Sequence, residues 1–511
     1  MNSQGAEMHS EDPIRRILIV GGGAAGWMAA LYLSRFLRYS NALITLMEPT
    51  GVGSAGVGEG SYPKLAGMLR NLRLDTDAFM RACNATYKLG TRFDDWQRPG
   101  EGYWHPLGIC GGTIDGVDLF HPWLRAQRIG TESRDYLDFS MQVASCEGLK
   151  APRPLTGSSP IIETGGYAFH LDSASLASYF RQIAVSEGVV HLFDDPQEVE
   201  RGEDGAISGV RTTSERIVNA DLYIDCSAPR AKLIEDALGD PWIDWADHCP
   251  CDKAVLSPLP RDPSIPPFTE ASALAAGWRW RIPLSHRVGI GYLYSSRHID
   301  DDSALMELLS REPPQQTLGA VPRLFSMRVG RRTHFWRHNC VALGDAAGML
   351  EPLGATGLLL VQHVLETLME HFPDRRFDSV LMRDFNKSLG SAYDETRDFV
   401  LLHYLLSQRA DTDFWREVRT LQMPDSLAEI LERYDATGAL PRSGNPVGPE
   451  HWRYLLYGNG RVPRRPSPQV SRINPEQAQA ILSRIIEKQR ELVDTLPTHR
   501  SLIQSIHERT W

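Results

Sequence analysis

The sequence predicts an α/β protein, in which a Rossmann-like dinucleotide-binding module with an added β-sheet precedes a mainly helical C-terminal module. Three observations predict this class: a strand, glycine turn and helix near the N-terminus, an alternating sheet pattern at 276–295, and almost wholly helical periodicity after residue 380. We expect the first module to span residues 14–375, with insertions on the substrate side at about 97–165 and 240–335. The helical module, which caps the pocket, is expected over residues 376–511.

The N-terminal module begins with a βαβ unit. Residues 16–20 are typical of a buried parallel strand, a helix is expected from about residue 26 to 37, and a second strand at 43–47 precedes Glu48. The first turn matches G-x-G-x-x-G, in which glycines allow a tight turn and close approach to a pyrophosphate, while a later acid binds ribose hydroxyls. A turn that only packs is the alternative. We expect Glu48 and the turn to bind a dinucleotide through Gly21, Gly23, Ala24, Ala25 and Gly26.

Two later segments favour FAD over NAD. Residues 220–227 and 340–346 each form a strand with a small-residue turn, and they resemble the second and third fingerprints of the glutathione-reductase-type FAD fold. This resemblance makes Asp345 the contact to the ribityl chain, with a helix N-cap as the alternative. The glycine-rich loop 50–64 resembles a flavin-contacting strap and contains Gly58. Because G-x-G-x-x-G occurs once, we expect no NADPH-binding domain, and a separate NAD(P)H-dependent flavin reductase would supply FADH2.

Composition argues against several other classes of protein. The 511 residues include 54 basic and 64 acidic side chains, a formal charge of −10, which disfavours a general nucleic-acid binder. Only Cys249 and Cys251 are close among seven cysteines, so we expect no disulfide scaffold, no metal site and a cytoplasmic location. The polar N-terminus lacks a signal-peptide pattern, and no apolar run is long enough to predict a membrane span.

A tryptophan-rich segment identifies a family. Residues 278–283 match W-x-W-x-I-P, and further segments follow one order along nearly the whole chain: VGGGAAGWMAA, GVGEGSYP, YKLGTRFDDW, YWHPLG, FHLD, GDAAGMLEPLGATG and DFVLLHY. Together they resemble the flavin-dependent halogenases of the tryptophan halogenase superfamily. The resemblance implies that FADH2 and O2 oxidise chloride or bromide to hypohalous acid, which a lysine delivers to an electron-rich ring. It also implies a wall between flavin and organic substrate, formed by Trp278, Trp280, Ile282 and Pro283.

Lys88 matches the catalytic lysine of this family by its context, Tyr-Lys-Leu-Gly. An ammonium group would hydrogen-bond and polarise hypohalous acid, whereas a neutral amine would form a haloamine. Burial lowers the pKa of a lysine and makes either role accessible near neutral pH. The alternative is a solvated lysine near the end of a helix that apolar spacing predicts over 76–90. Lys64 is the competing lysine, which we interpret as structural or cofactor-proximal.

Thr356 and Gly357 match the Thr-Gly pair that binds halide in this family. Backbone N–H groups at the start of a helix hold an anion without a formal cation. A simple helix start is the alternative, and it is compatible with halide binding because the same N–H groups serve both.

Three positions depart from the family pattern. Gly354 stands where tryptophan halogenases have a glutamate that works with the lysine, and Glu351 cannot be assumed to replace it. Leu107 replaces an aromatic wall of the indole site, and residues 440–447 lack the tyrosine pair near the amino-acid end of the substrate. We therefore expect an electron-rich aromatic or indole-type small molecule rather than free tryptophan.

His105 and Trp452 are candidate ring-stacking residues, with core packing as the alternative, whereas His403 and Trp415 fit core packing better. Two other functions stay open. One is a flavin-dependent monooxygenase that hydroxylates its substrate, which W-x-W-x-I-P disfavours; the other is a degenerate FAD-binding protein, which the loss of the acid at Gly354 favours. The sequence predicts no nucleic-acid or membrane partner and is compatible with a homodimer.

Overall fold

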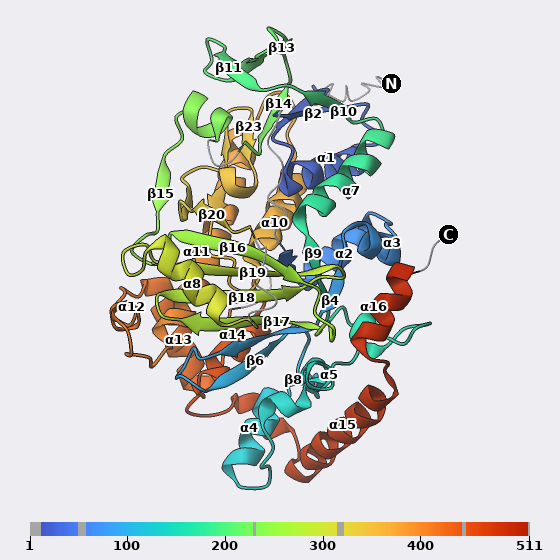
Figure 1. The fold of residues 1–511 in the computed structure, drawn as a ribbon, viewed down its shortest axis with the longest axis vertical. Coiled ribbons are helices and arrows are strands. Elements are labelled where there is room, and N and C mark those ends of the chain that lie inside the picture. Colours follow the sequence, from blue (N-terminus) through green and yellow to red (C-terminus); the bar gives the residue numbers. More distant parts are fainter. Residues whose placement is uncertain (1–11, 50–57, 228–230, 314–320, 442–445, 509–511) are drawn as a thin grey trace, which may run out of the picture.

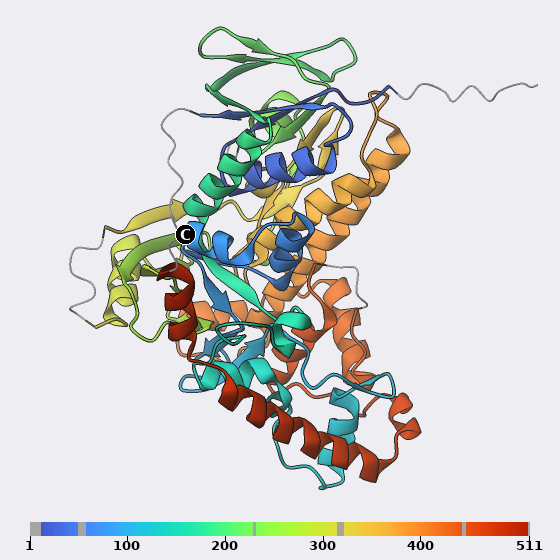
Figure 2. The same ribbon diagram turned by 90° about the vertical axis from the view of Figure 1, so that its right-hand side faces the viewer.

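The computed structural model of the chain describes residues 12–49, 58–227, 231–313, 321–441 and 446–508. Figures 1 and 2 show an elongated molecule, with a sheet of N-terminal strands at one end, a second large sheet in the middle and helices at the other end. Residues 50–57 of the predicted glycine-rich loop lie outside the described residues. In the described chain, no helix is both long and apolar enough to cross a membrane.

The N-terminal sheet confirms the Rossmann-like prediction. Its strands run in the order β10 (Val190–Phe193), β2 (Leu43–Glu48), β1 (Arg16–Val20), β14 (Leu222–Asp225), β23 (Cys340–Ala342) and β22 (Trp336–Arg337). All pairs are parallel except β23 with β22. Every residue of β1 after Arg16 is buried, as expected for a strand covered on both faces. Helices α1 (Ala24–Phe36) and α7 (Ser173–Ser186) lie side by side against this sheet (Figure 1).

The middle sheet contains the W-x-W-x-I-P strand. Its order is β20 (Arg323–Ser326), β16 (Lys253–Pro260), β19 (Arg287–Tyr294), β18 (Gly277–Pro283), β17 (Phe268–Leu274), β5 (Gly90–Asp94) and β6 (Gly102–Pro106). The predicted sheet at 276–295 is therefore confirmed as β18 and β19. Along β18 the tryptophans are buried, while Arg279 and Arg281 point to the opposite face and pair with Glu312 and Asp262 at 2.8 Å.

A small antiparallel sheet lies between the two large ones and corrects one prediction. Its order is β3 (Gly58–Gly60), β9 (Ala168–Asp172) and β4 (Thr86–Lys88). The helix predicted over 76–90 is wrong, because α3 (Thr76–Ala82) ends early. Asn84 then turns the chain with a φ of 51°, and β4 pairs with β9. Apolar spacing alone did not distinguish this helix and strand from one longer helix.

The C-terminal helices pack back on earlier parts of the chain. Helix α15 (Pro475–Thr495) covers α4 (Phe120–Arg128) and α5 (Met141–Glu147), and α16 (His499–Glu508) contacts α3. The predicted irregular insertion at 97–165 is therefore more ordered than its composition indicates, since α15 and α4 bury a shared cluster of hydrophobic side chains. The helices that reach the site are α10 (Thr356–Glu370), α11 (Ser379–Leu405) and α14 (Pro449–Gly458).

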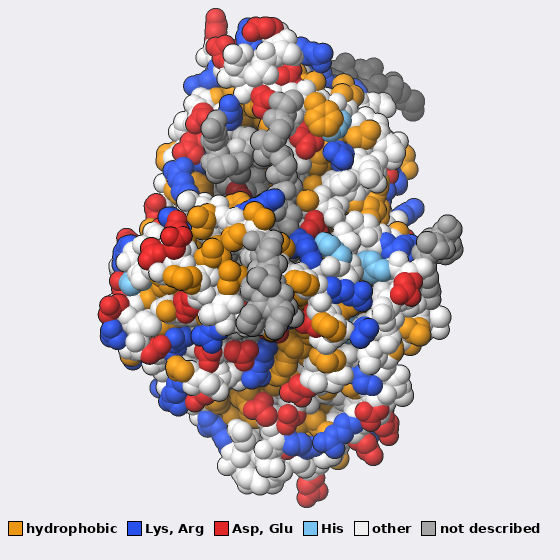
Figure 3. All heavy atoms as spheres, viewed as in Figure 1, with side chains coloured by type: hydrophobic (Ala, Val, Ile, Leu, Met, Phe, Trp, Pro, Cys, Tyr) orange, Lys and Arg blue, Asp and Glu red, His pale blue; other side chains and the backbone are white. Residues whose placement is uncertain are grey.

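The other described elements lie around this framework. They are α2 (Pro63–Asn71), β7 (Thr113–Ile114), β8 (Val117–Asp118), η1 (Tyr136–Phe139), α6 (Pro160–Glu163), β11 (Pro196–Arg201), β12 (Ile207–Thr212), β13 (Ile217–Val218), η2 (Lys232–Ala237), β15 (Trp242–Asp244), α8 (Asp301–Ser310), β21 (Gly330–Arg332), η3 (Gly344–Ala346), β24 (Gly348–Met349), α12 (Asp413–Val418), α13 (Asp425–Thr437) and η4 (Pro468–Arg472). On the face shown in Figure 3, basic and acidic side chains are interspersed.

Candidate active site

The turn between β1 and α1 consists of glycines, so its backbone carries no side chains of its own. Gly21 has a φ of 120°, and a Cβ there would lie 2.2 Å from the carbonyl oxygen of Cys226 on the neighbouring strand end. A Cβ on Gly26 would lie 1.9 Å from the carbonyl oxygen of Gly21, so glycine is required at both positions. Gly23 is exposed, and a Cβ there would meet none of the described residues within 4 Å. The start of α1 at Ala24 therefore presents open backbone, which suits an anionic group.

Glu48 lies against this turn. A Cβ on Gly22 would lie 2.3 Å from Cδ of Glu48, and Oε2 of Glu48 is 2.8 Å from Nε2 of His191. Trp27 of α1 meets the His191 ring edge-on at 4.8 Å. His191 thus orients Glu48, although 143 residues separate them. Sequence reasoning missed His191 because only the pairing of β10 with β2 brings it to this position.

Asp345 approaches the same turn from the end of β23. A Cβ on Gly344 would lie 2.9 Å from Cβ of Ala25, which places η3 against the first turn of α1. The Asp345 side chain is accessible to solvent yet lies deep among protein atoms, and this desolvation raises its pKa to about 6. Desolvation also raises the pKa of nearby Glu59 to about 7, opposed by a hydrogen bond with Ser173. A carboxyl group that is both accessible and surrounded lines a recess.

These features fit FAD. The bare turn can accept a pyrophosphate, Glu48 is held beside it for ribose hydroxyls, and the recess at Asp345 offers a polar contact for a ribityl chain. Each feature comes from a different strand end of the same parallel sheet, where α/β proteins bind nucleotides.

Strand β3 joins this recess to the predicted wall. A Cβ on Gly58 would lie 3.3 Å from Cγ2 of Ile282, so β3 packs directly on β18. Trp278 and Trp280 are buried, with ring centroids 5.5 Å apart. The tryptophans and Ile282 thus form a closed apolar surface beside β3.

Glu351 supports this wall. It is fully buried, and its Oε2 accepts hydrogen bonds from the Tyr404 hydroxyl at 2.5 Å and from Nε1 of Trp278 at 3.2 Å. Desolvation raises the pKa of Glu351 to about 7, although these hydrogen bonds oppose the shift. Glu351 therefore orients Trp278, a role distinct from that of the family glutamate whose position Gly354 occupies.

Lys88 points into the protein from β4. It is 2% exposed, so it is not a solvated lysine, and desolvation lowers its pKa to about 7. A Cβ on Gly60 would lie 3.1 Å from Nζ of Lys88 and 3.4 Å from Cβ of Ala355. The amine therefore lies beside β3 and beside the loop that precedes the predicted halide site. Lys64, in contrast, forms an ion pair with Glu366 at 2.6 Å, as its structural interpretation expects.

Hydrogen bonds on both sides fix the strand that carries Lys88. Thr86 Oγ1 donates to the carbonyl oxygen of Pro283 at 2.7 Å, which joins β4 to the end of the wall strand. The N–H of Tyr87 donates to Nε2 of His499 at 3.2 Å, and the other ring nitrogen of His499 lies 2.7 Å from the carbonyl oxygen of Ile265. The C-terminal helix α16 thus helps to position Lys88, a role that sequence reasoning missed.

The predicted halide loop has an unusual backbone. Gly354 and Ala355 have φ values of 79° and 69°, and α10 starts at the next residue, Thr356. Left-handed backbone at a non-glycine residue costs roughly 1 kcal/mol, and such strain is concentrated at functional loops. Thr356 Oγ1 donates to the carbonyl oxygen of Glu351 at 3.0 Å, while a Cβ on Gly357 would meet none of the described residues within 4 Å. At the start of α10, Thr356 is therefore buried and held by this bond, whereas Gly357 is exposed.

Aromatic side chains surround Gly354. A Cβ on Gly354 would lie 3.2 Å from the hydroxyl of Tyr62 and 3.8 Å from the Phe399 ring. The Tyr62 ring meets His451 edge-on at 4.9 Å, and the rings of His451 and His105 lie edge to edge with centroids 5.1 Å apart. These four rings come from four separate parts of the chain, and sequence reasoning identified only His105.

The structure places the other two substrate candidates differently. Leu107 follows β6 and is 6% exposed, and its N–H donates to the carbonyl oxygen of Leu89, the residue after Lys88. Trp452 is fully buried on α14 and packs edge-on against Phe399, with ring centroids 5.3 Å apart. Its neighbour His451 is the α14 residue that hydrogen-bonds His105. His403 and Trp415 are buried, as predicted for core residues.

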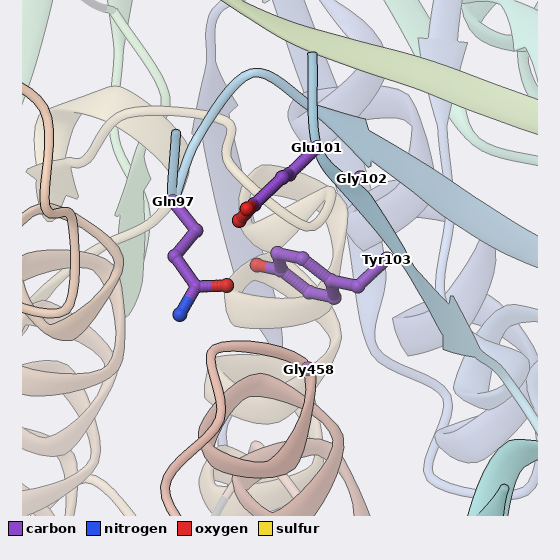
Figure 4. Close-up of a pocket in the computed structure, with 5 residues that line it drawn as sticks. All are labelled: Gln97, Glu101, Gly102, Tyr103 and Gly458. Atoms are coloured by element: carbon purple, nitrogen blue, oxygen red, sulfur yellow. The ribbon is translucent and has the colours of Figure 1, made fainter. Parts of the chain in front are cut away.

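A surface pocket opens at the other end of the contact between α14 and β6. Its volume is about 300 Å³, and the side chains of Gln97, Glu101 and Tyr103 converge on it beside Gly458 (Figure 4). The Tyr103 ring stacks on Phe93 at 5.0 Å. This pocket is separate from Lys88 and Gly354, since none of the residues that form their surroundings lines it.

Comparisons with known proteins agree with this geometry. The sequence profile of the tryptophan halogenase family matches residues 16–475. Tryptophan 6-halogenase SttH of Streptomyces toxytricini is 34% identical, over 98% of this chain and 100% of its own length. Tryptophan 7-halogenase RebH of Lentzea aerocolonigenes is also 34% identical, over 97% and 99%.

A solved structure is similar over the same length. BrvH, a flavin-dependent halogenase from Brevundimonas sp. BAL3, has a TM-score of 0.88 and 34% identity, covering 97% of this chain and 100% of its own. The profile spans the glycine turn, Lys88, the wall and the halide loop together. The chain therefore belongs to the tryptophan halogenase family and is an enzyme of the flavin-dependent halogenase class.

Proposed function

We propose that this enzyme makes hypohalous acid from chloride or bromide and delivers it through Lys88 to an electron-rich aromatic or indole-type molecule other than free tryptophan. One observation carries the proposal. Lys88 is a buried amine with the halide loop on one side and, close enough for its charge to influence them, the rings of His105 and His451.

The flavin side would bind FAD through backbone and two acids. The turn at Gly21, Gly23 and Gly26 would hold the pyrophosphate, Glu48 the ribose, and Asp345 the ribityl chain. When bound in its reduced form with O2, FAD supplies the two-electron oxidation of the halide. We expect a separate NAD(P)H-dependent reductase to provide FADH2. The seven free cysteines support a reducing cytoplasmic location.

Halide binding is assigned to the start of α10. The N–H groups of Thr356 and Gly357 carry partial positive charge at the start of α10, and Gly357 is exposed, so they can hold an anion without a paired cation. The buried wall of Trp278, Trp280 and Ile282, continued by Pro283, would keep the organic substrate apart from the flavin.

Lys88 is suited to hold hypohalous acid near pH 7. With a pKa of about 7, the amine exchanges between its protonated and neutral forms, so it can donate a hydrogen bond or react as a nucleophile. Its position on a strand fixed by Thr86 and Tyr87 limits its reach to the region of Gly60 and Ala355.

The substrate side supports a ring without an amino-acid tail. Leu107 removes one aromatic face, and Gly354 brings no carboxylate to the position where tryptophan halogenases have a glutamate. The relatives SttH and RebH are named for tryptophan, so free tryptophan is the informative comparison. The segment 440–447, which lacks the tyrosine pair, includes residues 442–445, and these lie outside the described residues.

The test supplies FADH2 from a generic flavin reductase, O2 and bromide, with indole, phenol and free tryptophan as substrates. We expect indole or phenol to gain bromine, visible as its isotope doublet in the mass spectrum, faster than tryptophan does. Lys88→Met should lower product formation by about 10²-fold or more, whereas Lys387→Met, on an exposed face of α11, should not. A product that gains only oxygen would establish a hydroxylase, and a preference for tryptophan would overturn the substrate assignment.

A further inference from the structure

A hydrogen-bonded pair of histidines lies where the substrate side lacks its carboxylate. Nε2 of His105 is 2.8 Å from Nδ1 of His451, and the two rings lie edge to edge with their planes within 13° of parallel. Both side chains are about 95% buried. Among the described residues nothing hydrogen-bonds Nδ1 of His105, so one buried nitrogen of the pair stays unused.

The pair leads toward solvent. Nε2 of His451 lies 3.9 Å from Oε1 of Glu450, a distance that one bridging water spans. The Glu450 side chain is 34% exposed. A path of three side chains therefore runs from the buried Nδ1 of His105 to the surface.

The tautomers along this path are mutually consistent. If Nδ1 of His105 is to accept a proton, the neutral His105 ring must carry its own proton on Nε2. This Nε2–H then donates a hydrogen bond to Nδ1 of His451. The His451 proton is then on Nε2, which faces Glu450. Each ring can accept a proton on one nitrogen while it releases one from the other.

The surroundings keep both rings neutral. Burial, and then the charges of His451, His403 and Lys88, hold the pKa of His105 well below its usual range. Burial and the charge of Lys88 lower the pKa of His451, while Glu450 raises it. Tyr62, which faces His451, stays protonated because burial raises its pKa. Neutral rings are bases, as a proton acceptor must be.

We propose that His105, His451 and Glu450 form a proton exit that takes over the role of the carboxylate missing at Gly354, and this rests on the proposed halogenase function. The ring carbon forms its bond to halogen as the O–X bond of hypohalous acid breaks, and the oxygen leaves as hydroxide. The ring C–H bond then breaks, its electron pair restores aromaticity, and its proton goes to Nδ1 of His105. The proton on Nε2 passes to His451, and the His451 proton passes to Glu450 and on to water, where it neutralises the hydroxide. The reset follows product release. Nδ1 of His105 gives its proton to water, and a new proton enters through Glu450 to Nε2 of His451. The His451 proton on Nδ1 then moves to Nε2 of His105, which restores both tautomers.

The test compares His451→Phe with wild type on indole and on ring-deuterated indole. Phenylalanine keeps an aromatic ring at this position but has no nitrogen to accept or release a proton, so we expect bromination to slow by about 10²-fold. We also expect deuterated indole to react more slowly than ordinary indole in the variant, because loss of the ring proton has become limiting. An unchanged rate without an isotope effect would overturn the relay, whereas an absence of brominated indole in wild type would overturn the proposed function itself.

Two further measurements do not depend on the His451→Phe variant folding. Glu450→Gln changes a half-exposed side chain, and we expect a smaller loss of rate with the same isotope effect; Glu101→Gln, at the separate surface pocket, is the matched control that should match wild type. Spectra of the protein labelled with ¹⁵N-histidine should show His105 and His451 both protonated at Nε2. A proton on Nδ1 of His105, or full activity of Glu450→Gln, would overturn the proposal.

Discussion

The flavin side and the substrate side of this active site are built by different means. The flavin side is a backbone cradle of close-packed glycines, in which Gly21 and Gly26 leave no space for a Cβ. The substrate side is a convergence of large side chains, Tyr62, His105, Phe399 and His451, supplied by separate elements. We infer that the first side tolerates almost no substitution, whereas the second can be reshaped to suit a different aromatic substrate.

Breaking the cradle should have the largest effect. Gly26→Ala places a Cβ 1.9 Å from the carbonyl oxygen of Gly21, a backbone atom that cannot move alone, so we expect the free energy of unfolding to fall by at least about 4 kcal/mol. Urea denaturation of the protein without FAD measures this. A loss below about 1 kcal/mol would contradict the rigid-cradle interpretation.

Gly23→Ala is the matched control for that prediction. Its Cβ meets no atom of the described residues within 4 Å, so we expect stability within about 0.5 kcal/mol of wild type. We expect FAD affinity, followed by flavin fluorescence, to fall by about tenfold or more, because the new methyl group enters the space reserved for the pyrophosphate. An unchanged affinity for FAD would show that the FAD phosphates do not bind next to Gly23.

Lys88 lies between the two sides, and its desolvation should make stability depend on pH. The unfolded chain keeps this lysine protonated up to about pH 10.4, while the folded protein releases the proton near pH 7. Between these values the unfolded state binds more protons, so the free energy of unfolding should rise with pH by up to about 1.4 kcal/mol per unit. The cost of burying the charged amine is fully present below pH 7.

Lys88→Met should remove this rise. We expect the difference in unfolding free energy between Lys88→Met and wild type to shrink steadily from pH 7 to pH 9, measured by urea denaturation at each pH. Lys387→Met, which removes an exposed lysine, controls for the change in net charge. Parallel curves for Lys88→Met and wild type would show that Lys88 is solvated.

The same contrast explains what could be predicted from the sequence. The glycine turn, strand β18 and helix α10 carry their sequence signal in residues a few positions apart, so the local pattern was sufficient to predict these elements. His191, Tyr62, His451 and His499 act through partners far along the chain, and strand register or helix packing brings them together. The helix predicted over 76–90 failed for the same reason, since the pairing of β4 with β9 determines where it ends.

A smaller effect is expected at Gly354, where a glycine-dependent backbone conformation lies against the large side chains of the substrate side. Gly354→Ala puts a side chain on backbone with a φ of 79° and a Cβ 3.2 Å from the Tyr62 hydroxyl, so we expect a loss of about 1–2 kcal/mol in stability. Gly357→Ala, three residues on and next to open space, should cost less than Gly354→Ala. Equal stabilities of the two variants would show that the backbone of the halide loop is unstrained.

A smaller effect than that of Gly26→Ala should come from Gly458→Ala, at the pocket that is separate from Lys88. A Cβ there would lie 2.2 Å from Cδ2 of Tyr103, and the Tyr103 ring cannot retreat freely because it stacks on Phe93. Overpacking of this kind costs about 1–3 kcal/mol, but replacing glycine in the last turn of α14 recovers up to about 1 kcal/mol, so we expect a net loss near 1 kcal/mol. Because Phe93 also contacts His105, at 6.0 Å, the rate of indole bromination should fall in parallel with stability if the aromatic side chains form one packed unit. A stability loss with an unchanged rate would show that Tyr103 adjusts independently, and the substrate side would then be more adaptable than its stacked rings indicate.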